Sequence, residues 1–150
     1  MKKLELFTVL AAAWLAIAAP TAMADMHGGV LDANTATREQ LASLPHMDET
    51  LADAVIGARP FASILDLDDL LASDLDDDQL EDVYARLFVP ISLNSASEEE
   101  ILKIPGVGAR MAHEFEEYRP YSNIEQFRRE IGKYVDEEEV ARLEQYVTLD

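Results

Sequence analysis

The residues best suited to chemistry stand in one short segment, Pro-Gly-Val-Gly at 105–108, immediately before a predicted helix. Glycine adopts turn conformations that are costly for other residues, and without a Cβ it lets a ligand approach the backbone. The unpaired N–H groups and the positive dipole end of the following helix attract anions such as phosphate. Val107 is expected to point inward, Ala112 to allow close helix packing, and Arg110 to lie at the mouth of the turn. A plain structural turn is the alternative interpretation.

The candidate anion site consists of this turn and the basic side chains expected near it. Backbone N–H groups would contact the anion directly, and lysine or arginine would add positive charge. The candidate residues are Lys103, Gly106, Val107, Gly108, Ala109, Arg110 and Lys133, with Arg128 and Arg129 as weaker candidates on a neighbouring turn.

Other kinds of functional site find little support in the sequence. The chain has no cysteine, which excludes disulfides and thiolate chemistry. His27, His46 and His113 lack metal-ligand spacing, and the acidic run at 74–78 lacks the glycine of a calcium-binding loop. No nucleophile–base pattern or Gly-rich nucleotide loop is present. We therefore predict a protein that is not an enzyme, with no catalytic residue and no bound metal.

The elements expected to position the turn occur twice in the sequence. Residues 31–90 align with residues 91–150 at a constant offset and without a gap. A register held over this length indicates two copies of one folding unit. The turn itself differs, because the first copy has Pro-His-Met-Asp at 45–48, so only the second copy carries the pair of glycines. Identical pairs include Asn34 and Asn94, Pro45 and Pro105, Ala52 and Ala112, Arg59 and Arg119, and Pro60 and Pro120.

Each copy is predicted to form four short helices and no sheet. Thr37 and Gln40 have the spacing of a capping box at a helix start, as do their counterparts in the second copy. The last helix of each copy follows Asp76 or Asp136 and has apolar residues at helical spacing. No segment alternates polar and apolar residues for long enough to indicate a strand. The predicted fold class is all-α, with two tandem domains.

The N-terminal segment at 1–24 has the layout of a secretory signal peptide. Lys2 and Lys3 precede an apolar run at 6–19, and small residues at 22 and 24 precede Asp25. The run is shorter than the ~20 residues that span a bilayer, so we expect cleavage between Ala24 and Asp25, with a retained anchor as the competing interpretation. A short leader at 25–30 and domains at 31–90 and 91–150 would follow. The location would be periplasmic or secreted, with no stable membrane insertion after cleavage.

The mature chain would be strongly acidic. Residues 25–150 contain 29 acids and 10 bases, a net charge of −19. Seven of these bases lie in the second copy, whose net charge is −7 against −11 for the first. Such a charge repels nucleic acid at long range, and high salt screens the repulsion.

The turn and its flanks resemble a known family. From Ile104 to Phe115 the sequence is similar to the hairpin of the helix-hairpin-helix family, which has a hydrophobic-Gly-hydrophobic-Gly turn followed by an alanine. The longer pattern from Leu93 to Arg119 resembles the bacterial competence DNA receptor (ComEA-type) domain, which pairs two such hairpins. The resemblance covers nearly all of 31–150 as two tandem helix-hairpin-helix domains, of which the first is degenerate.

The resemblance implies non-enzymatic, sequence-independent binding of double-stranded DNA outside the cytoplasm, in DNA uptake or competence. The candidate residues at 103–110 and Lys133 would then contact phosphates. It also implies a monovalent cation held by hairpin carbonyl groups, with no other cofactor. The alternative function is a secreted protein–protein interaction or structural module with an extracytoplasmic protein partner, because one fold can host different functions.

Overall fold

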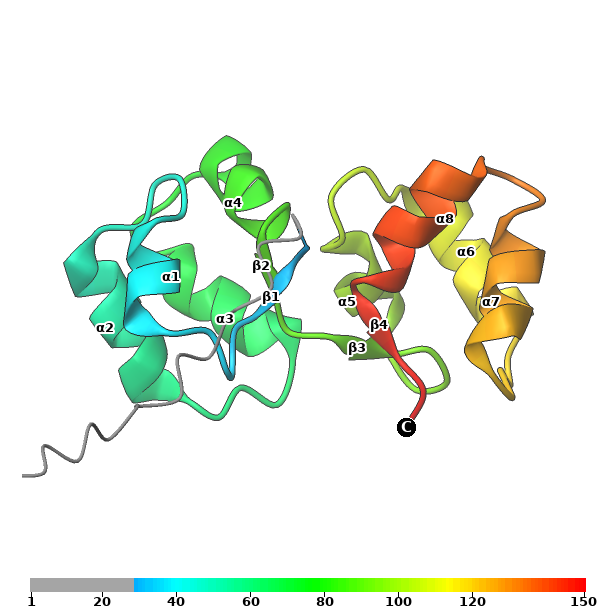
Figure 1. The fold of residues 1–150 in the computed structure, drawn as a ribbon, viewed down its shortest axis with the longest axis horizontal. Coiled ribbons are helices and arrows are strands. Elements are labelled where there is room, and N and C mark those ends of the chain that lie inside the picture. Colours follow the sequence, from blue (N-terminus) through cyan, green and yellow to red (C-terminus); the bar gives the residue numbers. More distant parts are fainter. Residues whose placement is uncertain (1–28) are drawn as a thin grey trace, which may run out of the picture.

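Residues 29–150 are described by the computed structural model shown in Figure 1. The predicted signal peptide at 1–24, its cleavage site between Ala24 and Asp25, and the leader up to residue 28 lie outside the described residues. Over the described range the chain is mostly helical, as predicted. None of the helices in this range is long and apolar enough to cross a membrane.

The elements of the two halves correspond one to one, in the register at which their sequences align. The first repeat contains β1 (Leu31–Asp32), α1 (Arg38–Ala42), α2 (Glu49–Ala58), α3 (Ile64–Leu71), α4 (Asp77–Tyr84) and β2 (Leu87–Phe88). The second repeat contains β3 (Ile91–Ser92), α5 (Glu98–Leu102), α6 (Ala109–Glu117), α7 (Ile124–Ile131), α8 (Glu137–Glu144) and β4 (Val147–Thr148). The repeat in the sequence is therefore also a repeat of structure.

Short strands are the main departure from the predicted elements. Each repeat is closed by a parallel pair of two-residue strands, β1 with β2 and β3 with β4. The N–H of Ala33 donates to the carbonyl of Phe88 at 2.8 Å, and that of Leu93 donates to the carbonyl of Thr148 at 2.9 Å. Strands this short leave no alternating pattern in the sequence, and the pairing joins the distant ends of a repeat. The expectation of no sheet was therefore wrong at these positions.

Side-chain caps fix where the helices begin. Thr37 and Gln40 form the predicted capping box at the start of α1, and the counterpart pair at 97 and 100 forms one at α5. Asp136 accepts a hydrogen bond from the N–H of Glu139 at the start of α8, at 2.9 Å. The side chain of Glu139 turns away from this cap and pairs with Arg142. The predicted helix starts are confirmed.

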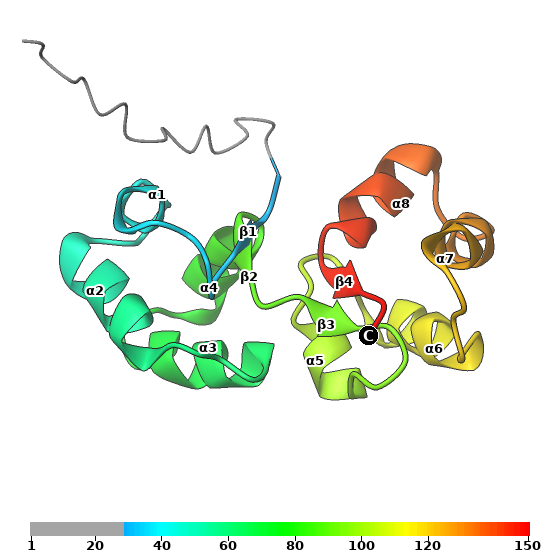
Figure 2. The same ribbon diagram turned by 60° about the horizontal axis from the view of Figure 1, so that its bottom comes forward.

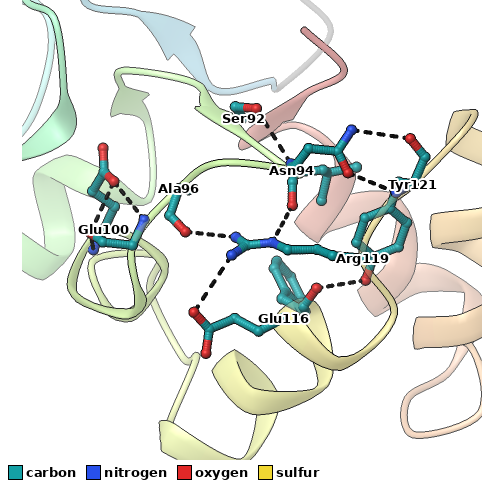
Figure 3. A network of polar contacts seen from close by, with 10 residues as sticks. Ser92, Asn94, Ala96, Glu100, Glu116, Arg119 and Tyr121 are labelled. Atoms are coloured by element: carbon teal, nitrogen blue, oxygen red, sulfur yellow. Dashed lines mark hydrogen bonds and ion pairs between the residues drawn. The ribbon is translucent and has the colours of Figure 1, made fainter.

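Identical polar residues in the two repeats lock the first loop of each repeat to its Arg-Pro turn. Arg119 donates through Nε to the carbonyl of Leu93 at 2.7 Å and through Nη2 to that of Ala96 at 2.6 Å (Figure 3). Asn94 accepts from the N–H of Tyr121 at 2.7 Å and donates to its carbonyl at 3.1 Å. The first repeat makes the same four hydrogen bonds, at 2.7 to 3.1 Å. Both Arg-Pro peptide bonds are cis.

The two repeats lie side by side (Figure 2). They pack through aromatic residues next to the strands. The rings of Phe88 and Tyr146 meet edge to face, with centroids 4.9 Å apart. The hydroxyl of Tyr146 donates to the carbonyl of Tyr84 at 3.1 Å, and all three side chains are buried. The connection between β2 and β3 is only Val89-Pro90, and the buried side chains of both repeats form one hydrophobic cluster.

Candidate anion-binding site

The turn between α5 and α6 shares its left-handed residue and its buried anchor with the turn between α1 and α2. Gly106 has a φ of 77°, in the left-handed region, and His46 holds the same position with a φ of 60°. Val107 and Met47 follow them, and both side chains are buried as the sequence predicts for the anchor. Glycine at 106 is therefore not required for the left-handed residue, and what distinguishes the two turns is their chemistry.

The helix after the turn begins differently in the two repeats. Asp48 is the N-cap of α2, and its carboxylate accepts a hydrogen bond from the N–H of Leu51 at 2.8 Å. Gly108 is the N-cap of α6 and has no side chain to offer, and the first turn of α6 contains no acidic residue. The first N–H groups of α6 and its positive dipole end are thus left to an external acceptor.

Three of the predicted residues meet at one hollow beside this helix start. The hollow has a volume of about 410 Å³ and is lined by Gly108, Arg110, Met111, Glu114, Lys133 and Tyr134. Arg110 is exposed at its rim, and Ala109 begins α6 next to it. The fold therefore brings the turn, Arg110 and Lys133 together, although Lys133 is distant from the turn in the sequence.

Lys103 is held on a different side of the turn. Its ammonium lies 2.6 Å from the carboxylate of Asp68 in the first repeat, and the Asp68 side chain is only 17% exposed. Lys103 and Gly106 line a second hollow of about 270 Å³, whose other wall includes Asp77 and Glu81 of α4. This side of the turn is acidic and does not favour an anion. Within residues 29–150, no group of three His, Cys, Asp or Glu side chains could hold a metal ion.

Sequence reasoning missed Arg142 on α8. Its Nη2 donates to the carbonyl of Pro105 at 2.9 Å and lies 2.7 Å from the carboxylate of Glu139. The counterpart position holds Asp82, whose carboxylate is 3.0 Å from Nε2 of His46. Each turn is thus tied to the last helix of its repeat, by different partners. The sequence carried one signal for this contact, because His46 and Asp82 of the first repeat are both replaced in the second, by Gly106 and Arg142.

A cluster around Glu114 was also missed. The Glu114 side chain is 9% exposed, and among the described residues its Oε2 has no hydrogen-bond partner. The hydroxyl groups of Tyr134 and Tyr118 lie 2.8 Å apart. This hydrogen bond raises the pKa of Tyr134, and the Glu114 carboxylate raises it further. Lys133 lies over the ring of Tyr118, 4.9 Å from its centroid. Lys133 is also paired with Glu130, which raises the pKa of Lys133.

The weaker candidates Arg128 and Arg129 lie at a third hollow, between α7 and α8. Arg128 is 2.6 Å from Glu144, and Arg129 is 3.1 Å from Glu130, so both guanidinium groups are engaged by acids. The hollow has a volume of about 810 Å³, and its apolar lining includes Gly132, Val135, Val140 and Ala141. Neither arginine lines the hollow beside Gly108.

Comparison with known proteins does not identify a function, so the function is inferred from the sequence and from the geometry of the site. The helix-hairpin-helix resemblance rests on the motif at 104–115 and the longer pattern around it. No protein-family model, curated protein or solved structure matches this chain.

Proposed function

We propose that this protein binds double-stranded DNA outside the cytoplasm, as a helix-hairpin-helix protein of the competence DNA receptor type. It would do so without catalysis and without reading the base sequence. The observation that carries the proposal is the open start of α6, where Gly108 offers no side chain and the counterpart Asp48 caps its helix. A phosphate can take the place of that carboxylate, because both accept hydrogen bonds from helix N–H groups and both suit the positive dipole end.

The proposed contacts come from the backbone and from two basic side chains. The N–H groups at 106 and 108–110 would donate to phosphate oxygens, whereas that of Val107 already donates to the carbonyl of Ile104 at 3.0 Å. Arg110 and Lys133 would add charge, since both line the hollow beside the helix start. Arg110 would contribute most, because the ammonium of Lys133 is also paired with Glu130 and that of Lys103 is paired with Asp68 on the acidic side of the turn. Contacts of this kind position a protein on the duplex but do not read bases.

The acidity of the chain sets the expected strength of this binding. Residues 25–150 have a net charge of −19, which opposes the approach of a polyanion at low salt. At high salt that repulsion is screened, since the Debye length falls to about 3 Å at 1 M. Each neutralised phosphate contributes about −0.9 to the salt slope of the affinity. With two cations at the site, we expect weak binding and a shallow slope.

The proposed setting is the periplasm or the outside of the cell, where DNA is captured for uptake. The signal-peptide pattern at 1–24 supports this location. The monovalent cation that the resemblance implies would contact hairpin carbonyl groups. It would compete there with Arg142, which already donates to the carbonyl of Pro105.

Fluorescence anisotropy with a labelled duplex of mixed sequence tests the proposal at low and high salt. Two substitutions graft residues of the first repeat onto the second. Gly108→Asp closes the helix start, and Arg110→Thr removes the exposed cation. Ser122→Asp is the matched control, because it adds one negative charge at an exposed position of the same repeat, outside the hollow.

We expect each graft to weaken binding about tenfold, the effect of roughly one charge-assisted hydrogen bond. The control should change the affinity less than about twofold, since it acts only through screened, long-range charge. Absence of binding at every salt concentration, or equal binding by the wild type and Gly108→Asp, would remove the turn as a DNA site.

A second function, docking of an extracytoplasmic protein, is favoured by the hollow between α7 and α8. Its volume of about 810 Å³ exceeds that of the hollow beside Gly108, and its floor includes Val135 and Val140. Ala141→Glu would place a charge on this floor at an exposed position. Under the docking function, the variant loses a partner that the wild type captures from an extracytoplasmic extract, while DNA binding is unchanged. Capture of the same partners by both proteins would exclude this hollow as the docking face.

A further inference from the structure

The first repeat reaches the α5–α6 turn of the second repeat with three carboxylates. Asp68 on α3, and Asp77 and Glu81 on α4, line a hollow of about 270 Å³. The opposite side of this hollow is the segment at 102–107, which ends in the turn. Acidic side chains of one repeat therefore lie next to the candidate anion site of the other.

The repeated fold does not require this negative charge. The positions of Asp68 and Glu81 are held in the second repeat by Arg128 and Ala141, although the same helices are present. At these two positions, carboxylates occur only in the repeat whose α3 and α4 face the turn of another repeat. The acidic wall is thus a feature of the contact between the repeats.

Asp68 holds an ammonium group that a phosphate would otherwise contact. Its Oδ2 accepts from Nζ of Lys103 at 2.6 Å, and its Oδ1 accepts from the Tyr84 hydroxyl at 2.7 Å. The Asp68 side chain is 17% exposed, so solvent screens this ion pair only in part. Carboxylate and phosphate oxygens both form charge-assisted hydrogen bonds with an ammonium group. A phosphate that approaches Lys103 must therefore compete with Asp68.

Asp77 and Glu81 add repulsion at short range. Both are exposed on α4, and they line the same hollow as Gly106. A phosphate that accepts from the N–H of Gly106 on this side meets two like charges. Such charges repel within a Debye length, which is about 10 Å at 0.1 M salt. This repulsion is local and adds to that of the net charge.

We infer that the first repeat is a built-in competitor of DNA, which restricts the turn of the second repeat. Asp68 keeps Lys103 from phosphate, and the carboxylates of α4 close that side of Gly106, so DNA approaches from the side of Arg110. The inference rests on the proposed DNA binding and gives the first repeat a regulatory role. It limits how many phosphates the turn neutralises, and the wild type binds DNA less tightly than its second repeat would permit.

Two double variants of equal charge test the repulsion, by anisotropy with the mixed-sequence duplex. Asp77→Asn/Glu81→Gln removes both carboxylates of α4 from the hollow. Glu39→Gln/Asp78→Asn is the matched control, because it removes one glutamate and one aspartate from exposed positions of the same repeat outside the hollow. At low salt the first variant should bind about threefold tighter than the control, and the difference should vanish near 1 M salt. Equal affinities at low salt would overturn the inference.

The salt slope of the affinity tests the competition for Lys103. Asp68→Asn keeps an acceptor for the Tyr84 hydroxyl but has no charge for the ammonium, so Lys103 becomes available to one more phosphate. The slope should steepen by about 0.9, and Lys103→Met in this background should restore the wild-type slope. Lys103→Met alone should leave the slope unchanged. A wild-type slope in Asp68→Asn, with a native circular dichroism spectrum, contradicts the inference and leaves DNA binding at Gly108 standing.

Absence of DNA binding by all of these proteins would end the proposed function, and inorganic phosphate then replaces DNA as the probe. The amide NMR signal of Gly106 reports on phosphate at the turn. The inference predicts a larger shift of this signal in Asp77→Asn/Glu81→Gln than in the control of equal charge. Equal shifts in the two variants, or no shift in either, would refute it.

Discussion

Arg59 and Arg119 occupy equivalent positions in the two repeats. Each donates hydrogen bonds to carbonyl groups of the loop between the first strand and the first helix of its repeat. The guanidinium of Arg119 donates to the carbonyl groups of Leu93 and Ala96, which belong to the same loop. A planar fork with several N–H donors can reach both acceptors at once. Lysine carries the same charge but presents it at a single point, so it cannot replace the fork.

Arg119→Lys should lower the free energy of unfolding by about 1 to 3 kcal/mol, through loss of charge-assisted hydrogen bonds to buried backbone. Urea unfolding followed by circular dichroism measures the change. Arg129→Lys is the control, because the Arg129 side chain is 65% exposed, and it should stay within about 0.5 kcal/mol of the wild type. Equal stability of both variants would show that the fork is not needed.

Gly108, the N-cap of α6, stabilises its helix less than an aspartate would at the same position. Aspartate caps helices better than glycine by a few tenths of a kcal/mol, so Gly108→Asp should make the protein slightly more stable. The same variant should bind DNA less tightly. Thermal unfolding measured beside the anisotropy titration separates the two effects. A less stable variant would mean that its weaker binding reflects a damaged fold.

At the scale of elements, α8 and α4 occupy equivalent places and are fastened by different chemistry. Arg128 on α7 holds Glu144 on α8 through two hydrogen bonds of 2.6 and 2.7 Å. The counterpart pair on α3 and α4 is Asp68 and Tyr84, whose hydroxyl donates at 2.7 Å. The repeat preserves the contact between the helices and not the type of interaction.

The Arg128–Glu144 pair gives α8 a defined dependence on pH. The hydrogen bond from Arg128 lowers the pKa of Glu144 in the folded protein. A lowered folded pKa means that the pair stabilises the protein fully above the unfolded value of about 4.3, and that this contribution is lost as the pH falls through the folded value. Glu144→Gln should therefore be less stable than the wild type at pH 7, by under about 1 kcal/mol because Arg128 is half exposed.

Urea unfolding of both proteins between pH 2 and pH 7 checks this expectation. The two stability curves should converge at low pH, where Glu144 of the wild type is protonated and resembles glutamine. Curves that stay parallel down to pH 2 would contradict an ionic contribution from this pair.

At the scale of the whole molecule, the residues that join the repeats are not themselves repeated. The first repeat presents Asp68, Tyr84 and Phe88 to the second, which contributes Lys103 and Tyr146. The corresponding positions at the free face of the second repeat hold charged or small polar residues. These are Arg128 for Asp68, Glu144 for Tyr84 and Thr148 for Phe88.

We expect the protein to be a monomer, because a second copy cannot repeat this contact. The position that corresponds to Lys103 in a first repeat is Ser43, and Arg128 is already paired with Glu144. The net charge of −19 adds repulsion between copies. Sedimentation equilibrium at physiological salt should give the mass of one chain. A concentration-dependent rise to a dimer or larger assembly would contradict the expectation.

Lys103→Met separates cohesion between the repeats from DNA binding. Removing the ammonium leaves a largely buried Asp68 carboxylate without its ion-pair partner, so stability should fall by about 1 kcal/mol or more. DNA affinity should fall less than about threefold for Lys103→Met and about tenfold for Arg110→Met. Arg110 is exposed beside the open helix start, whereas Lys103 is already paired with Asp68. Equal losses of affinity in the two variants would return Lys103 to the binding site.

The sequence by itself determined the repeat, the helix starts and the place of the turn. The gapless alignment of 31–90 with 91–150 predicted equivalent elements, and capping residues such as Thr37 and Asp136 marked helix starts correctly. The contrast between Gly108 and Asp48 was visible as a difference in residue type. These features were readable because they depend on contacts within a few residues along the chain.

Only the tertiary structure decided which of the candidate side chains are available. Lys103 is close to Gly106 in the sequence, yet it reaches across to Asp68, whereas distant Lys133 joins Gly108 and Arg110 at one hollow. The burial of Glu114 among residues of α6 and the loop at 133–134, and the two-residue strands, also depend on segments far apart in the sequence. Local patterns carry no information about such pairings, because they are set by how whole helices pack against one another.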